Sequence, residues 1–135
     1  MINKFTVAKV FNDKALAASG AVRFVSMIEE YSPEIDTPYI KESLLYGSDE
    51  SLGTASSDSD IARGVYTLTV YTPKINKGAK WQCLALIDEL NASMPKFTQL
   101  NESPSIMLRE AITGPTTTGE THISCDLDIR FTVIG

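Results

Sequence analysis

The segment 121–134 at the end of the chain alternates strictly between apolar and polar residues, and this constrains the fold more than any other feature. Its apolar positions are Ile123, Cys125, Leu127, Ile129, Phe131 and Val133. A period of two over this length is typical of a strand with one face on a core and the other in water. The fold therefore contains a sheet with a wet face, and that face carries Asp126, Asp128 and Arg130.

Two other segments have the periodicity of helices. Residues 79–92 carry the clearest helical stripe of the chain, which consists of Cys83, Leu86, Ile87, Leu90 and Met94. Residues 3–18 predict a further helix, with Asn3 as its N-cap and Gly20 just beyond its end. Its expected buried stripe is Val7, Phe11, Ala15 and Ala18.

Further strands are predicted over residues 22–31, 39–46, 64–72 and 105–113. In the last of these we expect Ile106, Leu108 and Ile112 to share one face. In 39–46 the apolar residues do not separate by position, so its faces are not assigned. The turn 114–119 joins the last two strands into a hairpin.

The order of these elements predicts an α+β fold rather than a doubly wound one. We expect one domain over residues 1–135, with a largely antiparallel sheet of about four to five strands and both helices packed on one face. The Ser-, Asp- and Gly-rich segment 47–63 is predicted to be one long polar loop, flexible when the protein is alone.

The composition of the chain narrows the classes of function that it can have. The chain has 135 residues, with 12 Lys+Arg against 17 Asp+Glu, and a net charge of −5. Such a chain is not attracted to phosphate backbones, which argues against nucleic-acid binding as its main role. Its apolar runs are too short for a membrane span, and residues 1–5 do not open a signal peptide. We therefore expect synthesis in a cytoplasm.

A catalytic or metal-binding set is not visible. His122 is the only histidine, and an exposed strand residue is the simpler interpretation of it. Cys83 and Cys125 are expected to be buried and reduced. The sequence around Asp58 and Asp60 begins like a calcium loop, but Ala62 stands where the next oxygen ligand belongs. We expect no cofactor, no metal and no enzymatic activity.

Asp126 and Asp128 form a pair of carboxylates on the wet face. A solvated acidic stripe is a simpler interpretation of this pair than an acid–base catalytic site. Trp81 lies off the main stripe of its helix, where it is either a secondary core contact or an interface anchor. These features favour a protein that acts by assembly.

The order of segments resembles the small tail terminator-like and tail-completion proteins of long-tailed bacteriophages. The resemblance covers nearly the whole chain and depends on segment 37–45 (TPYIKESLL), segment 62–74 (ARGVYTLTVYTPK), the helix 79–92 followed by 94–97 (MPKF), and the two-strand finish.

The resemblance implies a structural virion protein that forms a ring, usually a hexamer, at the head-proximal end of the tail tube. Such a ring stops tube polymerisation and offers a docking face to the head. The implied partners are further copies of the chain, the tail tube protein and head–tail connector proteins, while genome DNA passes through without specific binding and no membrane is involved.

Two sets of residues are candidates for this role. We expect Asp126, Asp128, Arg130 and Trp81 to contribute to the lumen or to a subunit interface. We expect the loop to contact the tube or the head through Ser48, Asp49, Glu50, Asp58, Asp60 and Arg63. The alternatives are another head–tail connector or minor tail subunit, or a small cytosolic α+β enzyme or ligand-binding domain.

Overall fold

The computed structural model describes residues 4–51, 60–94, 99–100 and 105–134 of the chain. In chain order the elements are α1 (Lys4–Ser19), β1 (Arg23–Val25), β2 (Tyr39–Ser51), β3 (Asp60–Pro73), α2 (Ala79–Ser93), β4 (Gln99–Leu100), β5 (Ser105–Thr113), β6 (Thr117–Thr118) and β7 (His122–Ile134). The α+β class predicted from the order of elements is confirmed, and the two-residue strands β4 and β6 add to the strands expected.

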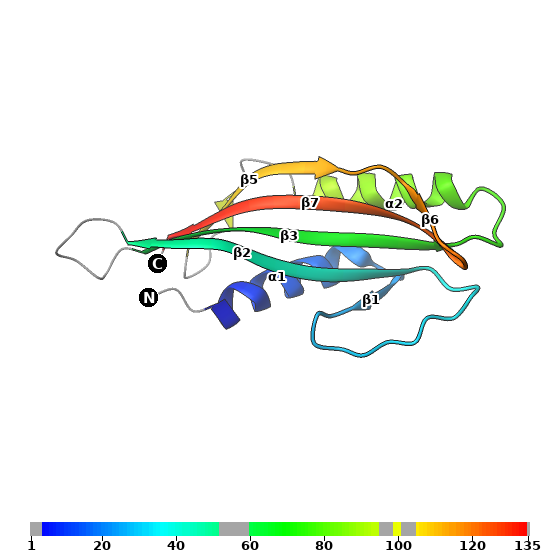
Figure 1. Cartoon of the computed structure of the whole chain (residues 1–135), viewed down its shortest axis with the longest axis horizontal. Coiled ribbons are helices and arrows are strands. Elements are labelled where there is room, and N and C mark those ends of the chain that lie inside the picture. Colours follow the sequence, from blue (N-terminus) through cyan, green and yellow to red (C-terminus); the bar gives the residue numbers. More distant parts are fainter. Residues whose placement is uncertain (1–3, 52–59, 95–98, 101–104, 135) are drawn as a thin grey trace.

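The strands form one sheet in the order β1-β2-β3-β7-β5-β4, and β6 also pairs with β7. Strand β1 runs parallel to β2, and the other described pairings are antiparallel. Strands β3 and β7 form the centre of the sheet, paired from Ile61↔Ile134 to Pro73↔His122. Figure 1 shows β2, β3 and β7 as long, nearly parallel lines through the molecule.

Both helices cover the same face of the sheet, as predicted. Figure 1 shows α1 along the side of β1 and β2 and α2 along the side of β5 and β7. The buried stripe of α1 contains Val7, Phe11 and Ala15, and that of α2 contains Cys83, Ile87 and Leu90. These side chains share one core with alternate residues of the central strands, namely Tyr66, Leu68, Val70, Cys125, Leu127, Ile129 and Phe131.

The strand predicted over 22–31 is much shorter in the structure, because β1 ends at Val25. A local turn follows, in which the Glu29 backbone N–H donates to the carbonyl of Ser26 (3.0 Å) and the Ser26 N–H donates to the Glu29 carboxylate (3.0 Å). Such local bonds compete with a sheet ladder. Ile28, which lies within the predicted strand, is 90% exposed.

The prediction of one loop over residues 47–63 is wrong at both of its ends. Strand β2 continues to Ser51 and β3 begins at Asp60, with backbone pairs that include Glu50↔Ile61. Continuing the ladder satisfies the backbone N–H and C=O groups whatever the side chains are, so a polar composition does not by itself end a strand. Residues 52–59 lie outside the described part of the chain.

A buried carboxylate explains why the faces of β2 could not be assigned from the sequence. Glu42 occupies a core-facing position and is only 6% exposed. Its Oε2 accepts hydrogen bonds from Asn12 Nδ2 (2.7 Å) and from the backbone N–H of Met27 (3.0 Å), and its Oε1 accepts one from the Tyr66 hydroxyl. The carboxylate therefore joins α1, the turn after β1, β2 and β3.

The Tyr66 phenol keeps its proton in this arrangement. Burial raises the pKa of Tyr66 far above its ordinary value, and the hydrogen bond to Glu42 raises it further. Asn12, Met27 and Tyr66 thus act as donors toward Glu42, and both of its carboxylate oxygens accept.

We expect Glu42→Ala to lower the free energy of unfolding by about 3 kcal/mol, because three donors lose a buried acceptor. Glu42→Gln should also destabilise the protein, since its amide NH₂ must face one of those donors. Urea unfolding measures both changes. Glu30→Gln, at an exposed site, is the matched control and should leave stability unchanged. A Glu42→Gln variant as stable as the wild type would contradict the need for two accepting oxygens.

Candidate functional site

The face of the sheet opposite the helices is the candidate functional surface. No helix of the described residues packs on it, and its central part carries the two predicted carboxylates. Asp126 Oδ1 accepts a hydrogen bond from Thr69 Oγ1, and Asp128 Oδ1 accepts one from Thr67 Oγ1, each at 2.7 Å. Asp126 is exposed and Asp128 is half-buried, so both lie off the core as the alternation of β7 predicts.

A basic region lies beside this acidic stripe on the same face. It is a hollow of about 560 Å³ lined by Leu45, Gly47, Arg63, Gly64, Val65, Arg109, Glu110, Arg130, Phe131 and Thr132. We call it the arginine hollow, because three of the four arginines of the chain line it. The carboxylate of Glu110, which also lines the hollow, lies 3.7 Å from Arg130 Nη1.

The sheet register brings the three arginines together around one threonine. Thr132 of β7 is the backbone partner of Arg63 in β3, and Arg130 lies two residues away on β7. Diagonal neighbours of this kind are about 7–8 Å apart, within reach of long side chains. Arg109 Nε donates to Thr132 Oγ1 at 3.3 Å, and Thr132 itself is 7% exposed.

Two β-bulges border the arginine hollow. In β2 the register shifts between Tyr46 and Asp49, and in β5 it shifts between Leu108 and Glu110. A bulge adds one residue to a strand, bends it and redirects the following side chains. The bulge in β5 also corrects a prediction: Ile112 does not share a face with Leu108, and it is 38% exposed.

The backbone is tightly packed at the floor of the hollow. A Cβ at Gly64 would lie 2.6 Å from the carbonyl oxygen of Leu45 and 2.7 Å from Cζ of Phe131. Only a glycine fits there without displacement of neighbouring atoms. The glycine thereby allows β3 to approach Leu45 of β2 and Phe131 of β7 closely.

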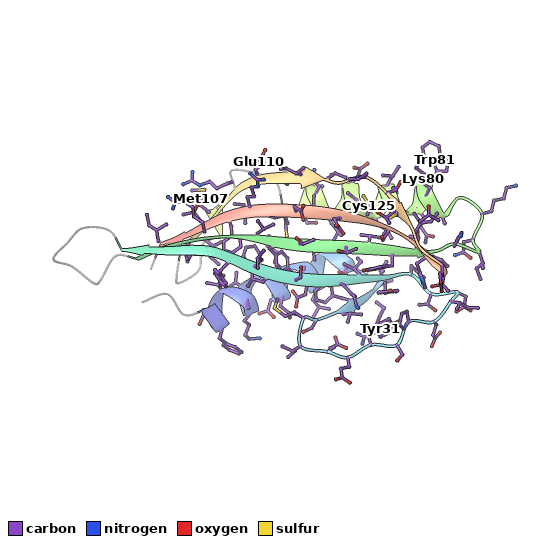
Figure 2. All side chains as sticks on the ribbon, viewed as in Figure 1. Tyr31, Lys80, Trp81, Met107, Glu110 and Cys125 are labelled. Carbon is purple, nitrogen blue, oxygen red and sulfur yellow. The ribbon has the colours of Figure 1, made fainter. Side chains whose placement is uncertain are left out.

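The candidate residues predicted from sequence do not form one surface. Ser48, Asp49 and Glu50 belong to β2, Asp60 and Arg63 belong to β3, and Asp58 lies outside the described residues. Trp81, grouped above with Asp126, Asp128 and Arg130, lies apart from them, since α2 packs on the opposite face of the sheet. Its side chain is 78% exposed. Figure 2 shows Lys80 and Trp81 projecting outward, at the end of the molecule opposite Met107 and Glu110.

His122 is buried rather than exposed, which corrects the prediction. It is 6% exposed, and Tyr39 lies against its ring with centroids 5.2 Å apart. Nε2 lies 3.1 Å from the Thr37 carbonyl oxygen, so Nε2 donates, and Nδ1 accepts from the Thr121 hydroxyl at 2.9 Å. The Nε2 bond fastens the segment before β2 to β7, while the Nδ1 bond is local, to the neighbouring residue Thr121.

Stacked tyrosines surround this histidine. The rings of Tyr39 and Tyr71 are nearly parallel, with centroids 4.4 Å apart, and Tyr31 packs on Tyr39 at 5.1 Å. The guanidinium of Arg23 lies over the Tyr31 ring, 5.2 Å from its centroid. The cluster holds the segment between β1 and β2 against the sheet.

An apolar groove lies on the other side of the molecule, between α1 and the turn after β1. It has a volume of about 180 Å³ and is lined by Phe5, Ala8, Lys9, Asn12, Ser26, Met27, Ile28 and Glu42. Phe5 is 75% exposed at its rim. Here Phe5, Met27 and Ile28 line a single groove, whereas isolated exposed apolar side chains are normal on any protein.

Cys83 and Cys125 are both buried and free, as expected. Burial raises the pKa of Cys83 to about 11, with smaller effects from Cys125 and Thr72, so the thiol stays protonated at neutral pH. Among the described residues, no three His, Cys, Asp or Glu side chains gather into a metal-binding group. In the same part of the chain, no helix is both long and apolar enough to cross a bilayer.

Sequence reasoning missed Arg109, Glu42 and the tyrosine cluster. Arg109 enters the hollow through the β5 bulge, which no residue pattern marks. Glu42 is a charged residue at a core-facing position, so it breaks the apolar alternation of β2, and the sequence does not indicate that it is buried. The tyrosines were visible in the sequence, but only the register of β2 with β3 and β7 brings Tyr39, Tyr71 and His122 together.

The tyrosine cluster should make the fold sensitive to alkaline pH. Burial, with smaller effects from Tyr71 and Tyr31, raises the pKa of Tyr39 to about 12. In the unfolded chain the phenol titrates near pH 10, so above that pH the unfolded state releases its proton first. We expect the contribution of Tyr39 to stability to be complete below about pH 10 and lost as the pH rises toward about 12.

Urea unfolding at a series of alkaline pH values measures this loss. Tyr39→Phe removes the titrating hydroxyl but keeps the stacked ring, so its stability should fall less steeply over the same range. Equal slopes for wild type and Tyr39→Phe would show that the Tyr39 hydroxyl has no part in the alkaline transition.

Comparison with known proteins identifies the fold but not the function. No protein-family model and no curated protein sequence matches the chain. Solved structures do match it, and one of them, of a protein whose name states no function, superposes with a TM-score of 0.75 at 16% sequence identity. That match covers 98% of this chain and 96% of the other. At this level of identity the likeness extends to the fold alone.

Proposed function

We propose that this chain is a structural virion protein that forms a ring at the head-proximal end of a phage tail tube. It ends tube polymerisation and provides a docking face for the head. Its partners are further copies of itself, the tail tube protein and the head–tail connector proteins. The sequence resemblance motivates this role. The observation that supports it best is the face of the sheet on which no helix of the described residues packs, and which carries aspartates in one part and arginines in another.

A closed ring needs two unlike surfaces on each subunit, because its contacts run head to tail. This chain presents such surfaces on different sides. The arginine hollow lies on the uncovered face of the sheet, and the apolar groove at Phe5 and Ile28 lies beside α1. Unlike, non-overlapping surfaces favour a ring over a simple twofold dimer.

An open strand edge adds a further contact surface. Strand β1 pairs with β2 only from Tyr39 to Lys41, and within the described residues no other strand pairs with that edge of β2. Leu45, further along the edge, is 71% exposed. A neighbouring subunit can pair with such an edge through backbone hydrogen bonds.

The acidic stripe suits a channel for DNA. Asp126 and Asp128 present carboxylates on a surface without a covering helix among the described residues. Carboxylates along a channel repel phosphates and so limit adhesion of the genome to the wall. We assign the stripe to the lumen of the ring.

Purified protein added to growing tail tubes should cap one end and halt elongation, giving tubes whose length no longer increases. Electron microscopy of labelled protein shows which end it occupies. Protein found along the tube or at its far end would contradict the role. Protein bound to the head connector but not to the tube would favour the alternative of a connector subunit.

Replacement of the stripe by neutral residues tests its assignment to the lumen. Asp126→Asn/Asp128→Asn keeps an acceptor for Thr67 and Thr69, so the fold and the capping of tubes should be retained. Capped tubes should then bind DNA at least several-fold more tightly at low salt. Asp88→Asn, at an exposed site on α2, is the control and should leave DNA binding unchanged. Equal DNA binding by all three proteins would place the stripe outside the lumen.

A further inference from the structure

We propose that the apolar groove between α1 and the turn after β1 is the binding site for one side chain, Trp81, of a second copy of the chain. This inference rests on the proposed function, because it names the head-to-tail contact between neighbouring subunits of the ring. It concerns self-association, which can be measured without a tail tube.

Trp81 has the properties of an interface anchor. It is the only tryptophan of the chain, it lies in the first turn of α2, and it is 78% exposed. Figure 2 shows it projecting away from the body of the molecule. Burial of a tryptophan removes about 150–250 Å² from water. Tryptophan is also among the residues most enriched at the energetic centre of interfaces.

The groove offers apolar surface to such a side chain. Phe5, Met27 and Ile28 are 75%, 37% and 90% exposed, and all three line the same groove. Exposed apolar side chains that gather in this way, rather than singly, mark interaction sites. The groove has a volume of about 180 Å³. Pockets that hold drug-sized ligands have roughly 300–1,000 Å³, so this groove suits one large side chain.

The polar groups of the groove suit an indole in particular. Glu42 and Asn12 line it beside the apolar residues. An indole has one N–H donor and no acceptor, and a carboxylate has about four acceptor positions. Of the described residues, three donate to Glu42, which leaves one acceptor position for the N–H of Trp81. A phenylalanine would fill the same apolar space without this hydrogen bond.

Opposite charges flank the two partners of the contact. Lys80 precedes Trp81 in α2 and projects outward beside it in Figure 2. Glu30 follows Ile28 by two residues and is exposed. Complementary charges around an apolar contact favour the correct partner and fix its orientation. An apolar centre with a charged rim is the usual composition of a protein interface.

The tryptophan and the groove lie on opposite sides of one molecule. Helix α1, which forms one wall of the groove, runs along the side of β1 and β2, whereas α2 runs along the side of β5 and β7 (Figure 1). Figure 2 shows Trp81 at the top of the view and Tyr31, three residues after Ile28, at the bottom. The contact is therefore intermolecular and heterologous. Each copy offers its tryptophan to one neighbour and its groove to the other.

The fluorescence of Trp81 reports this contact directly, because no other tryptophan contributes. As the protein concentration rises, the emission of the wild type should shift to shorter wavelength in step with self-association, which sedimentation equilibrium measures. Phe5→Ser/Ile28→Ser should keep the long-wavelength emission and associate at least about tenfold more weakly. Leu45→Ser, at a side chain that is 71% exposed and does not line the groove, is the matched control and should behave like the wild type.

Variants of Trp81 test the other half of the contact. Trp81→Ala should also associate at least about tenfold more weakly than the wild type. Trp81→Phe should associate at least about threefold more weakly, because it keeps an apolar ring and loses the N–H donor. Circular dichroism verifies that each variant is folded. Ile28→Ser alone, at a side chain that is 90% exposed, repeats the groove test if the double variant does not fold.

Several results would overturn the proposal. A wild-type chain that stays monomeric at high concentration, or that associates without an emission shift, does so. An emission shift that survives in the folded groove variant also does so, because Trp81 is then buried against another surface, such as a second Trp81 across a twofold axis. Loss of the shift in Leu45→Ser would assign the contact to the edge of β2. Equal association of Trp81→Phe and the wild type would contradict recognition of the indole N–H.

Capping of tail tubes by the wild type is a separate measurement. Capping without an emission shift that depends on the groove leaves the proposed function standing and rejects this contact. An emission shift that depends on the groove, in a protein that does not cap tubes, supports the contact and rejects the proposed function.

Discussion

The antiparallel pairing of β3 with β7 is the constraint on which the rest of the molecule depends. It runs from Ile61↔Ile134 to Pro73↔His122 without a register shift. Because side chains alternate across a strand, this single register decides that Tyr66, Leu68 and Leu127 meet the helices. The same register places Asp128 and Arg130 on the opposite face of the sheet. A slip of one residue would exchange the core for the charged face.

Sequence reasoning succeeded where the information is local. The alternation of β7 and the stripe of α2 each follow from residues close together in the chain, and both elements form within a residue or two of the predicted bounds. It failed where the outcome depends on distant partners. The ends of β2 and β3 are polar, yet each continues because the other is there to accept its hydrogen bonds.

Exceptions to the patterns mark the places where the structure is most specific. Glu42 stands at a core position that alternation assigns to an apolar residue, and it joins α1 to three other segments. Arg109 is the extra residue of a bulge, which brings it over Thr132. Sequence periodicity describes regular helices and strands only. A buried carboxylate and a bulge both interrupt it, so neither can be recognised from the sequence pattern. The arginine hollow is built from such irregularities.

Net charge and local charge lead to different conclusions about partners. A net charge of −5 keeps phosphate backbones at a distance. The clustering of three arginines on one end of the uncovered face acts only at short range, within about a Debye length of 8–10 Å. One chain can therefore repel a long polyanion through its net charge and still present a local cluster of guanidinium groups on one face of its sheet.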